Sequence, residues 1–146
     1  LDDGNILRYR ITQTEAYRGE EDTACHARFG KTKRNENMYR KGGCVYIYMI
    51  YGFHYMFNVV TGEVDKPQAV LVREVEEFPG PGKLTKALQI DKSLNGEILA
   101  TSNKIWIEDD DKHFQYKTAP RIGINYADEH YRNIEWRFIL ERDSCG

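Results

Sequence analysis

Residues 44–58 carry the clearest alternation of apolar side chains in the chain. The first half of this run alternates as a β-strand does, with Val45, Ile47 and Met49 on one face and Tyr46, Tyr48 and Ile50 on the other. The pair Tyr51-Gly52 then interrupts the pattern, and a second apolar run follows it. We therefore predict a β-hairpin with Tyr51 at its tip.

Weaker patterns predict the other elements. The hairpin strands should cover residues 44–50 and 53–61, and further alternating or apolar runs predict strands at residues 6–14, 68–76, 104–108, 121–125 and 137–141. Residues 62–67 are typical of a turn. Residues 83–90 predict a helix that follows Pro81-Gly82 and places Leu84, Ala87 and Leu88 on one face. This order predicts an α+β fold: a single, mostly antiparallel curved sheet with a few helices and a protruding hairpin.

The predicted hairpin is unusually aromatic. Six of its fifteen residues are Tyr or Phe, against 12% aromatic residues in the whole chain. Aromatic side chains in paired strands usually fill a core, because they bury a large apolar area. A tyrosine at a hairpin tip has little core to fill, however. It can wedge between stacked bases, and the tyrosines behind it can form walls for a flat ring.

A second candidate segment lies upstream, where the first predicted strand ends in Thr14-Glu15-Ala16-Tyr17 and a polar loop leads to Ala24-Cys25-His26. A glutamate with a tyrosine and a histidine close behind it is a plausible catalytic cluster. A solvated glutamate at a strand end is the plain structural alternative, since glutamate side chains are mostly exposed.

Composition narrows the possibilities only modestly. A chain of 146 residues supports one domain with a real core, and no apolar stretch approaches the length of a membrane span. The formal net charge of −2 is not typical of a nucleic-acid-binding protein. One short stretch is basic, however, and can contact phosphates. This stretch contains Lys31, Lys33, Arg34, Arg40 and Lys41.

Cysteine and histidine usage argues against a metal. The three cysteines, Cys25, Cys44 and Cys145, form no CxxC pair and suit a reducing, intracellular environment. The four histidines show no HExxH spacing. We expect neither a metal nor another cofactor.

Six ordered segments resemble the alkyladenine (3-methyladenine) DNA glycosylase family. They are Thr14-Glu15-Ala16-Tyr17, Ala24-Cys25-His26, Tyr46-Ile47-Tyr48-Met49-Ile50-Tyr51-Gly52, Asn58-Val59-Val60, Ala69-Val70-Leu71-Val72-Arg73 and Gly80-Pro81-Gly82-Lys83-Leu84-Thr85-Lys86-Ala87-Leu88. The tail segments Pro120-Arg121-Ile122-Gly123-Ile124 and Trp136-Arg137-Phe138 are similar to the closing strands of that family. The ordered set spans nearly the whole chain, which makes the resemblance far more specific than any one motif.

The resemblance implies a monofunctional enzyme of base excision repair, which flips alkylated or deaminated purines out of duplex DNA and hydrolyses the N-glycosidic bond. It assigns catalytic roles to Glu15, as the general base, and to Arg73. It assigns the intercalating role to Tyr51. The walls and lining of the base pocket correspond to Tyr17, His26, Tyr48, Asn58 and Leu71.

The resemblance also sets expectations for partners and extent. The partner is double-stranded DNA that contains damaged purines, and we expect a monomer, no membrane and an intracellular location. Residues 1–146 are expected to form one glycosylase domain. Relative to the family pattern, this domain lacks residues at its start and a segment where Phe78 meets Pro79.

Three other readings stay open from the residues alone. The same aromatics can serve a non-catalytic nucleic-acid-binding module, which would not need Glu15. A small-molecule glycoside hydrolase typically uses two carboxylates, and Glu15 is the one convincing candidate. A purely structural β protein would leave the ordered motifs unexplained. The lesion preference also stays open, because it depends on pocket width.

Overall fold

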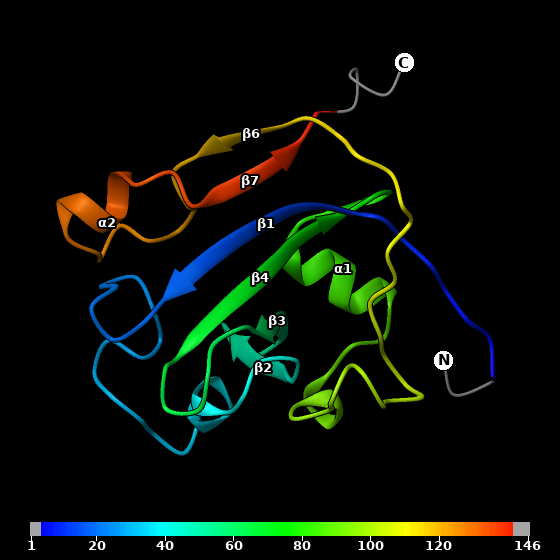
Figure 1. Cartoon of the computed structure of the whole chain (residues 1–146), viewed down its shortest axis with the longest axis horizontal. Coiled ribbons are helices and arrows are strands. Elements are labelled where there is room, and N and C mark those ends of the chain that lie inside the picture. The colour runs from blue at the N-terminus through cyan, green and yellow to red at the C-terminus, as the bar shows by residue number, and fades with distance from the viewer. Residues whose placement is uncertain (1–3, 142–146) are drawn as a thin grey trace.

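The computed structural model describes residues 4–141, and a single antiparallel sheet of seven strands dominates this part of the chain (Figure 1). The strands follow one another in the hydrogen-bonded order β2-β3-β4-β1-β7-β6, and β5 pairs with β4 beside this path. They are β1 (Ile11–Arg18), β2 (Val45–Ile50), β3 (His54–Val60), β4 (Gln68–Val75), β5 (Phe78–Pro79), β6 (Tyr116–Ala119) and β7 (Arg137–Leu140). The predicted α+β class with a mostly antiparallel sheet is confirmed.

Helices are few and short. The α-helices are α1 (Pro81–Ala87) and α2 (Glu129–Asn133), and the 3-10 helices are η1 (Glu36–Tyr39) and η2 (Lys92–Leu94). Helix α1 confirms the helix predicted at residues 83–90 after Pro81-Gly82, although it begins at Pro81 and ends at Ala87. Figure 1 shows α1 beside β3 and β4, where the two elements contact it, and α2 at the far end of the sheet.

The centre of the sheet is buried on both faces. The cluster on the α1 side contains Val45, Ile47, Phe57, Val72, Val75, Leu84 and Ile90. The cluster on the opposite face contains Cys25, Ala27, Met38, Tyr39, Cys44, Tyr46, Val60 and Ala69. The side chains of β2 therefore alternate between the two faces as predicted: Val45 and Ile47 face α1, and Tyr46 faces the other way. The loop between β1 and β2 covers that second face.

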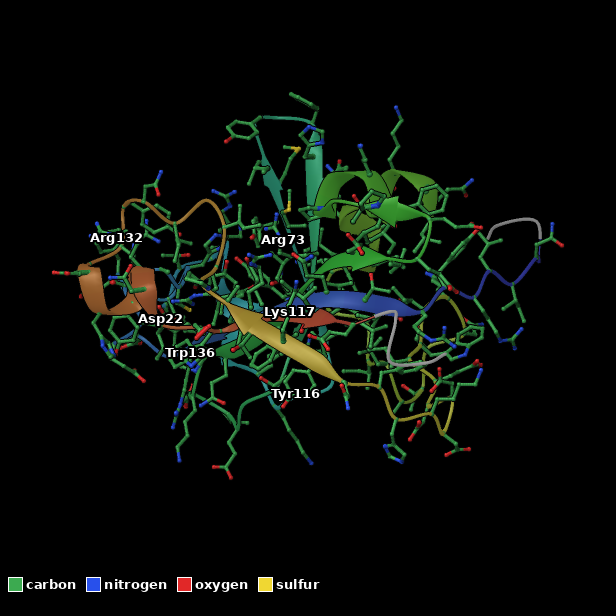
Figure 2. All side chains as sticks on the ribbon, turned by 90° about the horizontal axis from the view of Figure 1, so that it is seen from above. Asp22, Arg73, Tyr116, Lys117, Arg132 and Trp136 are labelled. Atoms are coloured by element: carbon green, nitrogen blue, oxygen red, sulfur yellow. The ribbon has the colours of Figure 1, made fainter. Side chains whose placement is uncertain are left out.

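The predicted hairpin is confirmed, with β2 and β3 paired from Val45 opposite Val59 to Ile50 opposite His54. At its tip the Phe53 amide donates to the Ile50 carbonyl (3.2 Å), and Tyr51 has a φ of 54°. Gly52 also has a positive φ, 76°, a conformation that glycine adopts readily. The hairpin stands out from the rest of the sheet in Figure 2, and the Tyr51 side chain is 82% exposed.

The first strand lies further along the chain than residues 6–14, and that prediction was wrong in its bounds. Strand β1 begins at Ile11 and continues to Arg18, so Glu15 lies inside the strand and not at its end. Residues 6–10 are not a strand, and neither are the predicted residues 104–108. Charged side chains join these two segments instead of a backbone ladder, through the ion pairs Arg8–Glu108 (2.9 Å) and Arg10–Asp110 (3.1 Å).

The strand predicted at residues 121–125 was also wrong, and the strand that pairs with β7 is β6 at Tyr116–Ala119. Strand β6 is largely exposed and polar at the sheet edge, so its sequence lacks the apolar signal of a buried strand. Residues 121–125 cannot join the ladder, because Arg121 is buried in an ion pair and the Ile122 amide donates to a side chain. Gly123 turns the chain with a φ of 76°.

A substitution at Leu84 can test the packing of α1 on the sheet. Its side chain is 1% exposed in the core cluster on the α1 side. Replacing Leu84 with Ala should lower the free energy of unfolding by about 2–5 kcal/mol, because the lost methyl groups leave a cavity. Urea denaturation measures this change. Val64→Ala, at a 62% exposed position, is the control and should change stability little; equal losses in both variants would contradict the packing.

Candidate active site

The sheet register brings three of the predicted site positions, Asn58, Leu71 and Glu15, into one row across the sheet, together with Tyr46. Tyr46 on β2 lies opposite Asn58 on β3, Asn58 lies opposite Leu71 on β4, and Leu71 lies opposite Glu15 on β1. Directly opposed residues of neighbouring strands point to the same face. Asn58, Leu71 and Glu15 therefore share the face that carries Tyr46.

The remaining strand residues reach this face by the two-residue period. Tyr17 follows Glu15 by two positions on β1, Tyr48 follows Tyr46 on β2, and Arg73 follows Leu71 on β4. Tyr17 and Tyr48 both pack against the cluster on this face. Figure 2 shows Arg73 below the hairpin, near the middle of the molecule.

Glu15 is the chemical centre of the site, because its carboxylate is fully buried and contacted by three donors. The Tyr17 hydroxyl donates to Oε1 at 2.8 Å, and the Ile122 amide donates to Oε2 at 2.8 Å. Arg73 approaches Oε1 with Nη1 at 3.5 Å and forms the ion pair of the site. A carboxylate offers about four acceptor positions, so these three donors leave one acceptor position unused by the contacts described. A buried acid with polar partners of this kind is a catalytic candidate.

The loop between β1 and β2 places His26 over the tyrosines. The centre of its ring lies 4.0 Å from that of Tyr48, and its Nδ1 lies 3.0 Å from the Tyr46 hydroxyl. Asn35 anchors the loop by donating to the His26 carbonyl. Burial, together with the charges of Arg34 and Arg28, lowers the pKa of His26 to about 4. The imidazole is therefore neutral at physiological pH.

The tyrosines of the site stay protonated. Burial is the main cause that raises the pKa of Tyr17, Tyr46 and Tyr48, and the negative charge of Glu15 adds to the effect at Tyr17 and Tyr48. The aromatic walls therefore carry hydroxyl donors and no negative charge. Tyr17 uses its hydroxyl to hold Glu15.

Asn58 is buried inside β3, and its side-chain amide donates to the carbonyls of Tyr46 (3.3 Å) and Met56 (3.4 Å). These bonds fix the orientation of the amide against β2. Leu71 is 2% exposed and lies between Asn58 and Glu15 in the same row. The structure therefore brings together all the predicted residues except Tyr51, which lies at the exposed end of the hairpin.

Sequence reasoning missed a second buried ion pair behind the site. Arg121 and Asp22 are 99 positions apart, and neither side chain is exposed. Nη1 and Nη2 of Arg121 contact the two Asp22 oxygens at 2.7 and 2.9 Å, and its guanidinium lies 4.7 Å from the centre of the Tyr17 ring. Arg121 lies in one of the family-like tail segments, but only the fold shows its partners. The Ile122 amide was missed because a backbone donor leaves no mark in a residue pattern.

Neither a metal site nor a membrane helix occurs in the part of the chain that the structure describes. Residues 4–141 contain no group of three His, Cys, Asp or Glu side chains that could hold a metal ion. Cys25 and Cys44 are free and buried, and Cys145 lies outside the described residues. No helix within those bounds is long and apolar enough to cross a bilayer.

Comparison with known proteins defines the class of protein. The model of the family described as methylpurine-DNA glycosylase (MPG) matches residues 1–79 and 78–144, in two parts that meet where Phe78 joins Pro79. The chain is a DNA glycosylase of DNA repair and thus a hydrolase. Within this class it belongs to the methylpurine-DNA glycosylase family.

Bacterial relatives support the same assignment. The chain is 43% identical to a protein of Psychrobacter cryohalolentis over 84% of this chain and 69% of the relative. It is 42% identical to a protein of Natranaerobius thermophilus over 94% of this chain and 81% of the relative. It is 46% identical to a protein of Borrelia garinii subsp. bavariensis over 90% and 78%. Each of these relatives carries the name "Putative 3-methyladenine DNA glycosylase".

The low pKa of His26 predicts a pH-dependent loss of stability. Below the ordinary value of 6.5 the unfolded chain binds a proton at this imidazole, whereas the folded chain does not bind it until about pH 4. Lowering the pH from 7 to 4.5 should therefore cost the parent about 2 kcal/mol of unfolding free energy through His26.

Urea denaturation of His26→Gln at the two pH values checks this, and its loss on acidification should be smaller than that of the parent. His113→Gln, at an exposed histidine, is the control for removal of an imidazole. A parent-sized loss in His26→Gln would contradict the prediction.

Proposed function

We propose that the chain is a monofunctional DNA glycosylase that flips alkylated or deaminated purines out of duplex DNA and hydrolyses their N-glycosidic bond, leaving an abasic site. The observation that carries the proposal is the buried Glu15 carboxylate with its three donors, on the same sheet face as Tyr17 and Tyr48. An acid next to aromatic walls is what the removal of a flat base requires.

The hairpin tip supports a role for Tyr51 as the wedge that fills the gap left by the flipped base. Flipping costs about a few kcal/mol, and base stacking on an aromatic ring returns about 1–3 kcal/mol. Tyr51 is exposed and adopts a positive φ, a conformation that is uncommon for a bulky residue. Strained backbone of this kind is concentrated at functional sites. A purely structural turn would favour Asn or Gly at this position.

The walls of the proposed slot are Tyr17, His26 and Tyr48. Their aromatic faces attract a positively charged alkylated purine, and the neutral state of His26 avoids repulsion of that charge. Leu71 lines the slot between Asn58 and Glu15. The Asn58 amide, fixed by two backbone carbonyls, meets the exocyclic amino group of guanine and disfavours that base.

Glu15 acts as the general base in the proposed reaction. It takes a proton from a water molecule while the water oxygen bonds to the sugar carbon. The bond from that carbon to the base nitrogen breaks, and its electron pair leaves with the base. The carboxylate also stabilises the positive charge that develops on the sugar. Arg73 holds Glu15 in place through their ion pair and reaches toward the water or a backbone phosphate.

The basic stretch lies beside the hairpin and supports contact with the DNA backbone. Arg34 donates to the Met49 carbonyl on β2 at 2.7 Å, which ties this stretch to the hairpin. Positive side chains along such an edge neutralise phosphates. The proposed partner is therefore double-stranded DNA with a damaged purine, bound by a monomer at an intracellular location.

Replacing Glu15 with Gln should abolish excision and preserve binding of lesion-containing duplex, because the amide cannot accept the proton from water. Release of hypoxanthine or ethenoadenine from a duplex oligonucleotide measures excision, with abasic sites revealed by alkali. Glu63→Gln, at an exposed turn, is the matched control and should excise like the parent. Retained excision in Glu15→Gln would remove Glu15 as the base. If the parent also binds the lesion duplex tightly but does not excise the base, a non-catalytic binding module is favoured.

Replacing Tyr51 with Ala should weaken binding of lesion duplex by roughly tenfold, in line with the loss of one aromatic stacking contact. Tyr51→Phe keeps the ring and should bind like the parent. Fluorescence anisotropy with a labelled lesion duplex, at one stated salt concentration, compares the three proteins. Unchanged affinity in Tyr51→Ala would exclude the wedge role.

A further inference from the structure

The buried pair of Asp22 and Arg121 lies directly behind a wall of the proposed base slot. The Arg121 guanidinium contacts two aromatic rings, lying over the Tyr17 ring at 4.7 Å from its centre and over the Trp136 ring at 5.1 Å. Figure 2 shows Asp22 and Trp136 close together on this side of the molecule, and both contact Arg121.

Arg121 has a clear structural task in this position. It donates to the carbonyls of Ala16 on β1 (2.9 Å) and Tyr131 on α2 (3.1 Å), so it joins these two elements. The next residue, Ile122, donates its amide to Glu15. A guanidinium here therefore helps to hold the catalytic carboxylate, but it also places a positive charge against Tyr17.

Asp22 cancels that charge. Its two oxygens accept both Arg121 bonds, and they also accept the amides of Arg18 (3.0 Å) and Ala24 (3.0 Å). At the hydroxyl of Tyr17 the charges are paired as well, because Glu15, which accepts from that hydroxyl, forms an ion pair with Arg73. Tyr17 thus contacts two ion pairs: Asp22–Arg121 through its ring and Glu15–Arg73 through its hydroxyl.

A base that stacks on Tyr17 must use the ring face that Arg121 does not cover. The guanidinium then lies roughly 8 Å from the base, on the opposite side of one ring. At that distance in a partly buried site, an uncompensated charge changes binding of a cation by about tenfold or more. It leaves binding of a neutral base nearly unchanged.

We propose that Asp22 determines specificity by neutralising Arg121 behind Tyr17, so that the slot admits purines that carry a positive charge as well as neutral ones. This inference rests on the proposed function. Asp22 does not touch the base and acts through Arg121. A structural role alone would lower excision of charged and neutral lesions equally, whereas the charge role changes their ratio.

The test compares two substrates within one enzyme preparation. Duplex DNA treated with a methylating agent supplies 3-methyladenine, whose nucleoside is positively charged and which lacks the exocyclic amino group of guanine, and a duplex oligonucleotide supplies hypoxanthine, which is neutral. The ratio of the two single-turnover excision rates does not depend on the fraction of folded enzyme. Spontaneous base loss is subtracted with a control that contains no enzyme.

Asp22→Asn should lower the ratio of charged to neutral excision by about tenfold. Arg121→Gln should move the ratio in the opposite direction, because it leaves the Asp22 charge behind Tyr17. The double variant Asp22→Asn/Arg121→Gln should return the ratio toward that of the parent. Arg132→Gln, which removes a positive charge at an exposed position, should keep the parental ratio.

The outcomes separate this inference from the proposed function. If the parent excises neither lesion, the proposed function fails. If the parent excises both and Asp22→Asn keeps the parental ratio, the charge role of Asp22 is overturned while the proposed function stands. Should Asp22→Asn fail to fold, Arg121→Gln decides, because a ratio at or below the parental value in that variant overturns the role equally.

Discussion

The site depends on keeping the carboxylate of Glu15 buried inside a β-sheet. Burial of such a group without partners costs far more free energy than a small domain can spare. Three donors from separate parts of the chain satisfy it: the Tyr17 hydroxyl, the Arg73 guanidinium and the Ile122 amide. Strand β1 lies between β4 and β7, so Arg73 on β4 can reach Glu15. The path of residues 120–124 brings the Ile122 amide to the same carboxylate.

The need to satisfy Glu15 also explains why the C-terminal part does not form the predicted strand at residues 121–125. The Ile122 amide there donates to the Glu15 side chain and not to a ladder, and Arg121 is buried with Asp22 and holds this segment against β1. A buried ion pair of this kind adds little net stability, but loss of either partner leaves a costly unpaired charge. The segment is therefore held in one place by its polar contacts.

The sheet positions the strand residues of the site through its register. Antiparallel pairing places Asn58, Leu71 and Glu15 side by side from three strands, and the two-residue period adds Tyr17, Tyr48 and Arg73 to the same face. The opposite face packs against α1 and contributes stability. The division matters because the face with Glu15 can keep polar and aromatic groups while the α1 face supplies an ordinary apolar core.

Local pattern alone determined the hairpin of β2 and β3, strands β4 and β7 and helix α1, because alternation and turn chemistry are properties of neighbouring residues. The candidate site residues were identified from the ordered motifs that resemble the glycosylase family. The bounds of β1, the edge strand β6 and the irregular path of residues 121–125 were decided by the tertiary structure. So were the pairing of Asp22 with Arg121 and the Ile122 amide on Glu15. Each of these depends on partners distant in sequence, and a buried charge or a backbone donor acquires its role only when the fold brings such partners within hydrogen-bond distance.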